Sequence, residues 1–170
     1  MTRVVVIGNA GGGKSTLCRA VCQAHRLPYH AIDKIQWKPN WVQTPKAEFE
    51  ALHLDLISRE RWLIDGYGPW ESVKARLLAA DTIILVDHPI WIHYWWAAKR
   101  QLKSLFLGRP DGPEGCPMWP VTIRLFKMMW WLHKEMRPKL TCAIYKREGE
   151  ARIIHIRSPR ELDRFAAEPV

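Results

Sequence analysis

Residues 3–15 read Arg3-Val4-Val5-Val6-Ile7-Gly8-Asn9-Ala10-Gly11-Gly12-Gly13-Lys14-Ser15 and join an apolar run to a glycine-rich loop. From Gly8 to Ser15 the loop fits the phosphate-binding pattern G-x-x-x-x-G-K-[ST] at every position. The run before it is continuous and β-branched, which is typical of a strand buried on both faces of a parallel sheet. After the loop, apolar residues recur at helical spacing from Leu17 to Ala24, so a helix is expected to begin near Lys14.

The chemistry of this loop follows from its glycines. Without a Cβ, they let backbone N–H groups turn inward around phosphate oxygens, and the helix that follows adds the positive end of its dipole. We expect Lys14 to reach the β- and γ-phosphates and the Ser15 hydroxyl to hold Mg²⁺. The predicted nucleotide-binding residues are Gly8, Asn9, Ala10, Gly11, Gly12, Gly13, Lys14, Ser15 and Thr16. The chain has no N-K-x-D signature for guanine, which favours ATP over GTP.

Length and hydropathy predict one cytoplasmic domain. The chain has 170 residues, which suits a single α/β domain covering residues 1–170. Its most apolar stretch, 82–98, is interrupted by Asp87, His88 and Pro89, so no membrane span is expected. The run 4–7 is too short for the apolar core of a signal peptide.

The net charge of +9 is concentrated in the C-terminal half. Residues 1–98 carry 11 Lys/Arg against 9 Asp/Glu, whereas residues 99–164 carry 15 against 7. This basic half could bind phosphate-rich ligands, nucleic acid or a membrane surface, or it could simply be solvated.

The tryptophans and the cysteines each allow two interpretations of their role. Most of the ten tryptophans are expected to pack in the core or in a lid, while exposed ones could stack on a base or meet a partner. Cys18, Cys22 and His25 share one helical face and could hold a metal, but small buried core residues are the stronger interpretation of these cysteines.

Strand-like and helical segments alternate along the chain, which predicts a parallel sheet with helices on both faces. After the first strand, strands are expected at 28–33, 61–68, 82–87 and 151–156. Helices are expected from a cap at Thr44-Pro45, at 70–80, after Pro89, at 121–136 and after a capping box at Ser158. Residues 37–41 and 106–120 are predicted loops.

Three aspartates end predicted strands. Asp33, Asp65 and Asp87 would all lie at the carboxyl edge of the sheet, where ligands bind in open α/β folds. They are therefore expected to converge on the side of the glycine loop. Each of them could instead be an ordinary strand-end cap.

The chain resembles the DNA topology modulation proteins, which are adenylate-kinase-like P-loop proteins of bacteria. The shared segments span nearly the whole chain: 8–16, His30-Ala31-Ile32-Asp33-Lys34, Trp37-Lys38-Pro39 with Trp41, 63–66, Arg109-Pro110-Asp111 with Glu114-Gly115-Cys116-Pro117, and 156–165. The resemblance implies a nucleoside-kinase-like sheet in the order 2-3-1-4-5, with a lid at about 104–120 between the fourth and fifth strands.

Two positions depart from the patterns of these relatives. Met118 stands where the family usually has an acid after Cys-Pro. The arginine with which adenylate kinases grip AMP is replaced by Tyr67-Gly68-Pro69 after Asp65-Gly66, which argues against AMP as the acceptor.

These residues predict transfer of the γ-phosphoryl group of ATP to a small acceptor, with Mg²⁺ as cofactor. The resemblance implies that Asp33 meets the acceptor and that Arg109 closes over the transferring group, so Lys14, Asp33 and Arg109 are the predicted catalytic residues. Arg100, a predicted nucleotide-binding residue, and Lys103 lie on the helix before the lid and would close over the transferring group with Arg109. Both could instead belong to a solvated helix face. Asp65 and Asp87 are weaker candidates for Mg²⁺ contacts through water.

Two other functions remain open. The chain could be a nucleotide-dependent DNA-associated regulator without kinase activity, acting through its basic half, although no helix-turn-helix or zinc finger is recognisable. Peripheral membrane attachment through the tryptophan-rich helices is a third possibility. The acceptor and the oligomeric state are not identified by the sequence.

Overall fold

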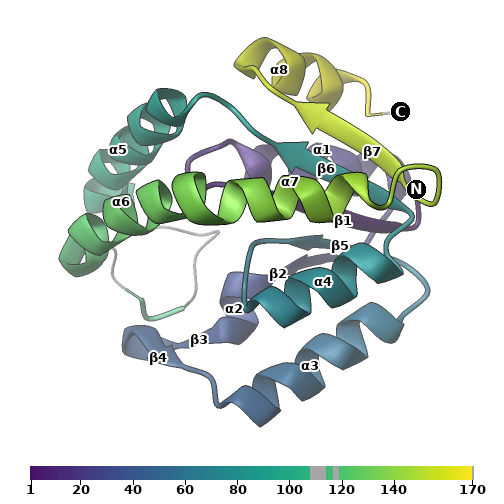
Figure 1. Ribbon diagram of the computed structural model, residues 1–170. Helices are drawn as coiled ribbons and strands as arrows, with labels where there is room; N and C mark the ends of the chain where they lie inside the picture. The colour runs from purple at the N-terminus through teal and green to yellow at the C-terminus, as the bar shows by residue number, and fades with distance from the viewer. Residues whose placement is uncertain (108–113, 117–118, 170) are drawn as a thin grey trace.

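The computed structural model describes residues 1–107, 114–116 and 119–169 (Figure 1). Its strands are β1 (Arg3–Gly8), β2 (Tyr29–Ala31), β3 (Trp37–Lys38), β4 (Val42–Gln43), β5 (Trp62–Asp65), β6 (Thr82–Val86) and β7 (Arg152–Ile156). Its α-helices are α1 (Lys14–His25), α2 (Ile32–Gln36), α3 (Lys46–Ser58), α4 (Trp70–Ala79), α5 (Ile90–Leu107), α6 (Thr122–Trp131), α7 (Arg137–Tyr145) and α8 (Pro159–Ala167). Short 3₁₀ turns cover Pro39–Trp41 and Trp119–Val121, and a π-helical turn, Leu132–Met136, joins α6 to α7.

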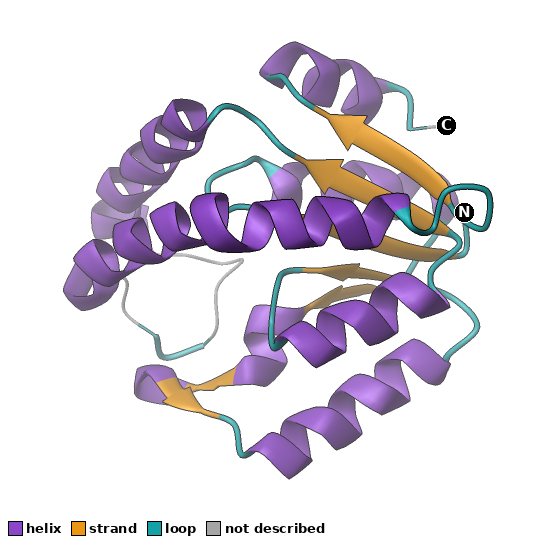
Figure 2. Cartoon of the chain, viewed as in Figure 1, coloured by secondary structure: helices purple, strands orange, loops and turns teal. Residues whose placement is uncertain are grey.

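Five strands form one parallel sheet in the order β2-β5-β1-β6-β7 (Figure 2). Counted along the chain without the separate β3–β4 hairpin, this order is 2-3-1-4-5, and the predicted α/β fold is confirmed. The register aligns Val6 of β1 with Asp65 of β5, and Asp65 with Ala31 of β2. The P-loop and the ends of three strands therefore meet at one edge of the sheet.

Each face of the sheet carries its own core because side chains alternate along β1. Val5 and Ile7 pack in the cluster covered by α3, α4 and α7, whereas Val4 and Val6 pack in the cluster covered by α1 and α8. All four side chains are fully buried, and burial of each contributes about 1.5–3 kcal/mol. This two-sided burial explains why the strand is apolar at every position from Val4 to Ile7.

The segment between β2 and β5 differs from its prediction in three places. Asp33 lies in the short helix α2 rather than at a strand end, and 37–43 form the β3–β4 hairpin where a loop was expected. Helix α3 begins at Lys46 without a side-chain cap, so the predicted Thr44 cap is wrong.

The tryptophan-rich helix α5 turns an unexpected face outward. Its buried residues include Ile92, His93 and Ala97, whereas Trp91 and Trp95 are 66% and 57% exposed. Helix α5 has apolar residues on more than one side, so the sequence pattern did not identify the side that packs. The prediction that most tryptophans are core residues is wrong for these two.

The helix predicted at 121–136 is observed as α6 and the π turn that follows it, with Val121 in the preceding 3₁₀ turn. Met129, Leu132 and Met136 are buried, but Met128 is 44% exposed. Trp130 and Trp131 are also about half exposed.

None of the helices in the described part of the chain is long and apolar enough to cross a membrane.

Candidate nucleotide and phosphoryl-transfer site

The P-loop has a backbone that only glycine fits at two of its positions. Gly11 has a φ of 69°, and a Cβ added there would lie 2.4 Å from the carbonyl oxygen of His93. A Cβ on Gly8 would lie 2.1 Å from the carbonyl oxygen of Val86. The loop is therefore pressed against the end of β6 and the start of α5, with its glycines at the contacts.

Helix α1 begins at Lys14, directly after the loop. Gly13 adopts the left-handed conformation, and its carbonyl accepts from Thr16 N at 3.1 Å and Leu17 N at 3.2 Å. Since no side chain caps this helix end, its free N–H groups are available to an anion. The ammonium of Lys14 donates to the carbonyl of Asn9 at 2.8 Å, so it lies over the loop with which it is expected to bind phosphates.

Two side chains fasten the loop to neighbouring helices. The Asn9 side chain accepts from Ala10 N and donates to the carbonyl of Met129 in α6, both at 2.8 Å. The buried His93 ring on α5 lies 3.0 Å from the carbonyl of Ala10, through Nδ1. Burial lowers the pKa of His93 to about 4, so the ring is neutral at pH 7 and Nδ1 donates. The P-loop is thus fastened to α5 and α6, which the motif alone did not indicate.

Asp65 lies beside the P-loop lysine, as predicted. Its carboxyl is buried, and burial raises its pKa, while Lys14 lowers it and Asp33 raises it again. The hydroxyl of Tyr29 donates to Oδ2 at 3.3 Å. Among the residues that the structure describes, Oδ1 has no hydrogen-bond partner. A buried carboxylate oxygen without a protein partner is suited to a bound water or a hydrated cation.

Asp33 belongs to the same electrostatic cluster. It is the second residue of α2, half-buried, two residues beyond the point where Ala31 pairs with Asp65. Its charge acts on Asp65 and on the buried Arg76. The fold therefore brings Lys14, Asp33 and Asp65 together.

Arg76 is a buried charge that the sequence pattern missed. It lies on α4 with no exposed surface and donates from Nη2 to the carbonyls of Gly66 and Tyr67, at 3.2 Å for Gly66. Burial lowers its pKa to about 10, opposed by Asp65 and Asp33. Arg76 thereby fixes the turn after β5 and partly balances the two carboxylates.

Asp87 has a different environment from the other two aspartates. Arg137 donates to both of its oxygens, Nε to Oδ1 at 2.6 Å and Nη2 to Oδ2 at 2.8 Å, and His155 Nε2 lies 3.1 Å from Oδ2. Burial alone would raise the pKa of Asp87, but these hydrogen bonds bring it below its usual value. The carboxylate is 8% exposed and both of its oxygens are engaged, which favours a structural ion pair over the predicted Mg²⁺ contact.

A small cavity lies between this ion pair and the loop. Gly8 and Asn9 line it on one side, and Tyr67, His133 and Arg137 line it on others. Arg137 is half exposed and follows the π turn, a local irregularity that often occurs at functional sites. The cavity places a guanidinium near the P-loop that the sequence analysis did not select.

The predicted lid is described only in part. Arg109 and Met118 lie outside the described residues. Within the segment, Gly115 accepts from Asn40 N at 2.9 Å and the thiol of Cys116 donates to the carbonyl of Lys38 at 3.3 Å, so 114–116 contact the β3–β4 hairpin. Arg100 lies on α5, half-buried, one turn after Trp96, whose ring would be 3.0 Å from a Cβ on Gly13.

The described residues fit a nucleotide with Mg²⁺. The loop offers a cradle that Cβ atoms would obstruct, a lysine, a hydroxyl at Ser15, and the unpartnered oxygen of Asp65. A dedicated protein-only metal site is a separate matter. Among the described residues, no three His, Cys, Asp or Glu side chains lie together in a way that could hold a metal ion. Cys18, Cys22 and His25 therefore do not form the metal site that their shared helical face allowed.

The fold is similar to that of two solved shikimate kinases. The shikimate kinase of Acinetobacter baumannii in complex with shikimate superposes with a TM-score of 0.63 at 14% identity, over 99% of this chain and 90% of that one. The shikimate kinase of Bacteroides thetaiotaomicron gives 0.56 at 15% identity, over 99% and 95%. Identities this low show a shared fold and not a shared substrate.

Sequence comparisons are narrower. A family model described as PduV-EutP, ethanolamine utilisation – propanediol utilisation, matches residues 1–54, the part of the chain that holds the P-loop. No curated protein matches the chain. The comparisons thus show the α/β fold shared with the shikimate kinases, and the resemblance to the DNA topology modulation proteins remains a prediction.

Proposed function

We propose that this chain is an ATP-dependent phosphotransferase that phosphorylates a small molecule. One observation carries the proposal: a P-loop lysine and two carboxylates, Lys14, Asp33 and Asp65, share one electrostatic cluster at the carboxyl edge of a kinase-type sheet. Phosphoryl transfer needs positioning and charge neutralisation more than covalent chemistry by the protein. This cluster can supply both.

The nucleotide half of the reaction falls to the P-loop. Its free N–H groups and Lys14 would bind the β- and γ-phosphates, which requires the ammonium to leave the Asn9 carbonyl. Ser15 and, through water, Asp65 would hold Mg²⁺, which when bound neutralises charge on the phosphates. The raised pKa of Asp65 fits a carboxylate that is stabilised when a cation arrives.

The acceptor half falls to the segment between β2 and β5. Asp33 would accept a hydrogen bond from the acceptor hydroxyl and orient it toward the γ-phosphate. Arg109 and Arg100 would approach from the lid side, where a guanidinium can grip two phosphate oxygens at once. Arg137 lines the cavity next to the loop and offers a further cation for the acceptor or the transferring group.

The acceptor class follows from this arrangement. A carboxylate facing the site suits an alcohol, and no arginine directly follows β5 to grip a nucleoside monophosphate. We therefore expect a small hydroxylated metabolite. Shikimate, which the similar A. baumannii enzyme binds, belongs in the first panel with other hydroxy acids, sugars and nucleosides.

The test is ADP release from Mg·ATP across that panel. One acceptor should raise turnover of the wild type well above its basal rate, and Lys14→Ala should abolish both activities. Asp33→Asn should lose the acceptor-stimulated rate while it keeps ATP binding, because its role lies with the acceptor. An Asp33→Asn variant with unchanged stimulated turnover would contradict the assigned role.

A nucleotide-dependent DNA-associated role is the second candidate, favoured only by the excess positive charge of residues 99–164. It predicts DNA binding that depends on ATP and weakens steeply with salt. Binding that ignores ATP would be nonspecific attraction.

A further inference from the structure

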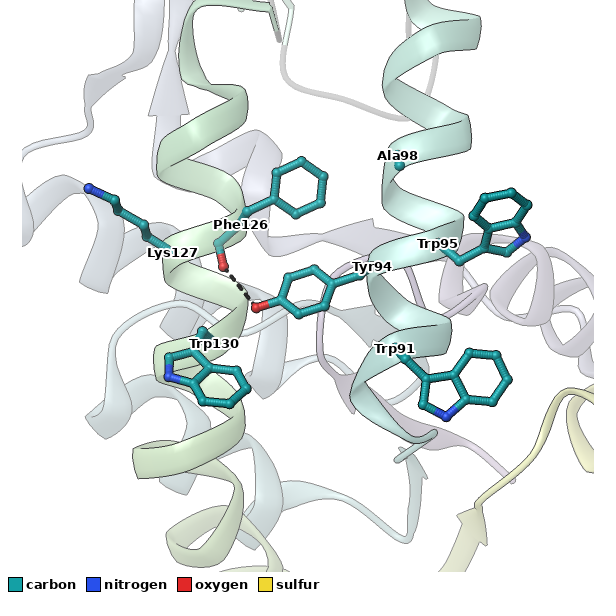
Figure 3. Close-up of a pocket in the computed structure, with 7 residues that line it drawn as sticks. All are labelled: Trp91, Tyr94, Trp95, Ala98, Phe126, Lys127 and Trp130. Atoms are coloured by element: carbon teal, nitrogen blue, oxygen red, sulfur yellow. Dashed lines mark hydrogen bonds between the residues drawn. The ribbon is translucent and has the colours of Figure 1, made fainter.

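Helices α5 and α6 form an aromatic groove on the surface. The groove has a volume of about 1010 Å³ and is lined by Trp91, Tyr94 and Trp95 from α5 and by Phe126 and Trp130 from α6, with the indoles of Trp91 and Trp95 on the side of α5 away from α6 (Figure 3). Tyr94 and Phe126 point into the gap between the helices, and the Tyr94 hydroxyl donates to the Phe126 carbonyl at 3.4 Å. These two side chains therefore form the bottom of the groove, while the tryptophans at its sides remain exposed to solvent.

The exposed apolar surface extends beyond the groove. Single exposed apolar residues are ordinary on a protein surface, but these two neighbouring helices carry several of them. Its members are more than 40% exposed: Trp91, Trp95, Leu102, Ile123, Met128, Trp130 and Trp131. Leaving four indoles in water is unfavourable unless another surface covers them.

Charge identifies that surface as anionic. Three lysines lie at the groove, since Lys127 lines it and Lys99 and Lys134 contact its tryptophans. Two of the lysines lie on groove tryptophans, with Lys99 Nζ 4.8 Å from the ring centre of Trp95 and Lys134 Nζ 5.1 Å from that of Trp130. A second copy of the chain would bring an equally basic face to this one, which charge repulsion disfavours.

We propose that this face docks on an anionic membrane surface. Indoles and lysines side by side are the combination that seats at the level of lipid headgroups, with the ring toward the acyl chains and the ammonium near phosphate. Each lysine or arginine near an anionic bilayer strengthens binding about fivefold. This docking does not depend on the kinase reaction.

The face adjoins the nucleotide site through the same two helices. On the opposite side of α5, His93 holds the carbonyl of Ala10, and α6 receives the side chain of Asn9 through Met129. The membrane face and the P-loop are thus two sides of one helical layer. Docking would leave the nucleotide edge of the sheet uncovered.

The test is binding of the full chain to lipid vesicles at low salt, measured by co-sedimentation. We expect binding to vesicles of mixed phosphatidylcholine and phosphatidylglycerol, and little binding to phosphatidylcholine alone. Bound protein should show a blue shift of tryptophan emission, because the indoles leave water. High salt should weaken binding, since these charges are exposed and are screened.

Matched variants separate the face from the rest of the surface. Lys99→Gln with Lys127→Gln should lower partitioning about 25-fold, whereas Lys46→Gln with Lys74→Gln, also exposed but on α3 and α4, should change it much less. An apolar pair makes a second comparison. Trp91→Ala with Trp95→Ala should lose binding, and Leu54→Ala with Leu78→Ala, each 65% exposed in the wild type, should not.

Several results would overturn the proposal. Equal affinity for neutral and anionic vesicles, or equal effects of the groove and control pairs, would remove its basis. Tight binding of single-stranded DNA without vesicle binding would assign the face to nucleic acid. A wild-type dimer in sedimentation analysis that the tryptophan pair converts to a monomer would assign it to a second copy. As a control, the variants should keep the unfolding midpoint of the wild type. A change in their vesicle binding then reflects the altered face and not a loss of folding.

Discussion

The two strand-end aspartates Asp65 and Asp87 should respond in opposite ways to the same substitution. Asp87→Asn removes the charge that receives two hydrogen bonds from Arg137 and one from His155. Charge-assisted hydrogen bonds contribute about 1.5–3 kcal/mol each, but Arg137 is half exposed and water can replace part of the interaction. We therefore expect a loss of about 2 kcal/mol in the free energy of unfolding.

Urea denaturation at pH 7 measures this loss. With an m-value of about 2 kcal/mol/M, the midpoint should fall by about 1 M. The sign of the pH dependence follows from the lowered pKa of Asp87: its contribution is present above the unfolded value of about 3.9 and is lost as pH falls through the folded value. The difference in the free energy of unfolding between wild type and variant should thus be present above about pH 5 and shrink as the pH falls below about 4.

Asp65→Asn is the matched comparison. Because the pKa of Asp65 is raised, the ionised group costs stability above the unfolded pKa, and the amide removes that cost. The urea midpoint should stay equal or rise, while Mg-dependent nucleotide turnover falls. The reasoning is refuted if Asp87→Asn keeps the wild-type midpoint and loses Mg-dependent nucleotide binding, since Asp87 would then be the metal contact.

Three further predictions concern the loop and the buried histidines. Gly11→Ala should abolish nucleotide binding, because its Cβ would meet a backbone oxygen at 2.4 Å, whereas Gly149→Ala, with a φ of 87° and nothing within 4 Å, should cost only about 1 kcal/mol of stability by urea denaturation. Asn9→Ala should raise the Kd for Mg·ATP about tenfold in calorimetry, because two hydrogen bonds that shape the loop are lost; an unchanged Kd would show that they are dispensable. Burial lowers the pKa of His53 to about 4, so the unfolded state binds a proton at a higher pH than the folded state does, and stability falls as the pH drops from about 6.5 to 4. His53→Leu should reduce the slope of the free energy of unfolding against pH by up to about 1.4 kcal/mol per pH unit, and an unaltered slope would contradict the burial argument.

The sheet and the P-loop were predictable because their signals are local. Five parallel strands need apolar residues on both faces, and runs such as Val4–Ile7 and Ile83–Val86 show this directly. The loop requires glycine where the backbone contacts β6 and α5, so its motif is contiguous in the sequence. Local patterns of this kind can be recognised in the sequence without knowledge of the tertiary structure.

The roles of the aspartates were not predictable, because they depend on distant partners. Asp65 and Asp87 both follow buried strands, but Asp87 is paired with residues 50 and 68 positions away. The contact between Asn9 and Met129 spans 120 positions. No spacing rule connects such residues.

The packing of α5 was also beyond the sequence. Trp91 and Trp95 form an apolar stripe as convincing as the one that includes Ile92 and Ala97, and only the position of the P-loop decides which is buried. An amphipathic pattern identifies a helix and not the side that packs when both sides are apolar.

The fate of the γ-phosphate tests the central claim most directly. The wild type is incubated with Mg²⁺, γ-labelled ATP and the acceptor that most stimulates ADP release, with Lys14→Ala as control. The proposed phosphotransferase predicts that label appears on the acceptor in proportion to ADP, and that the variant transfers none. Label that appears only as inorganic phosphate, or transfer that survives in Lys14→Ala, would contradict it.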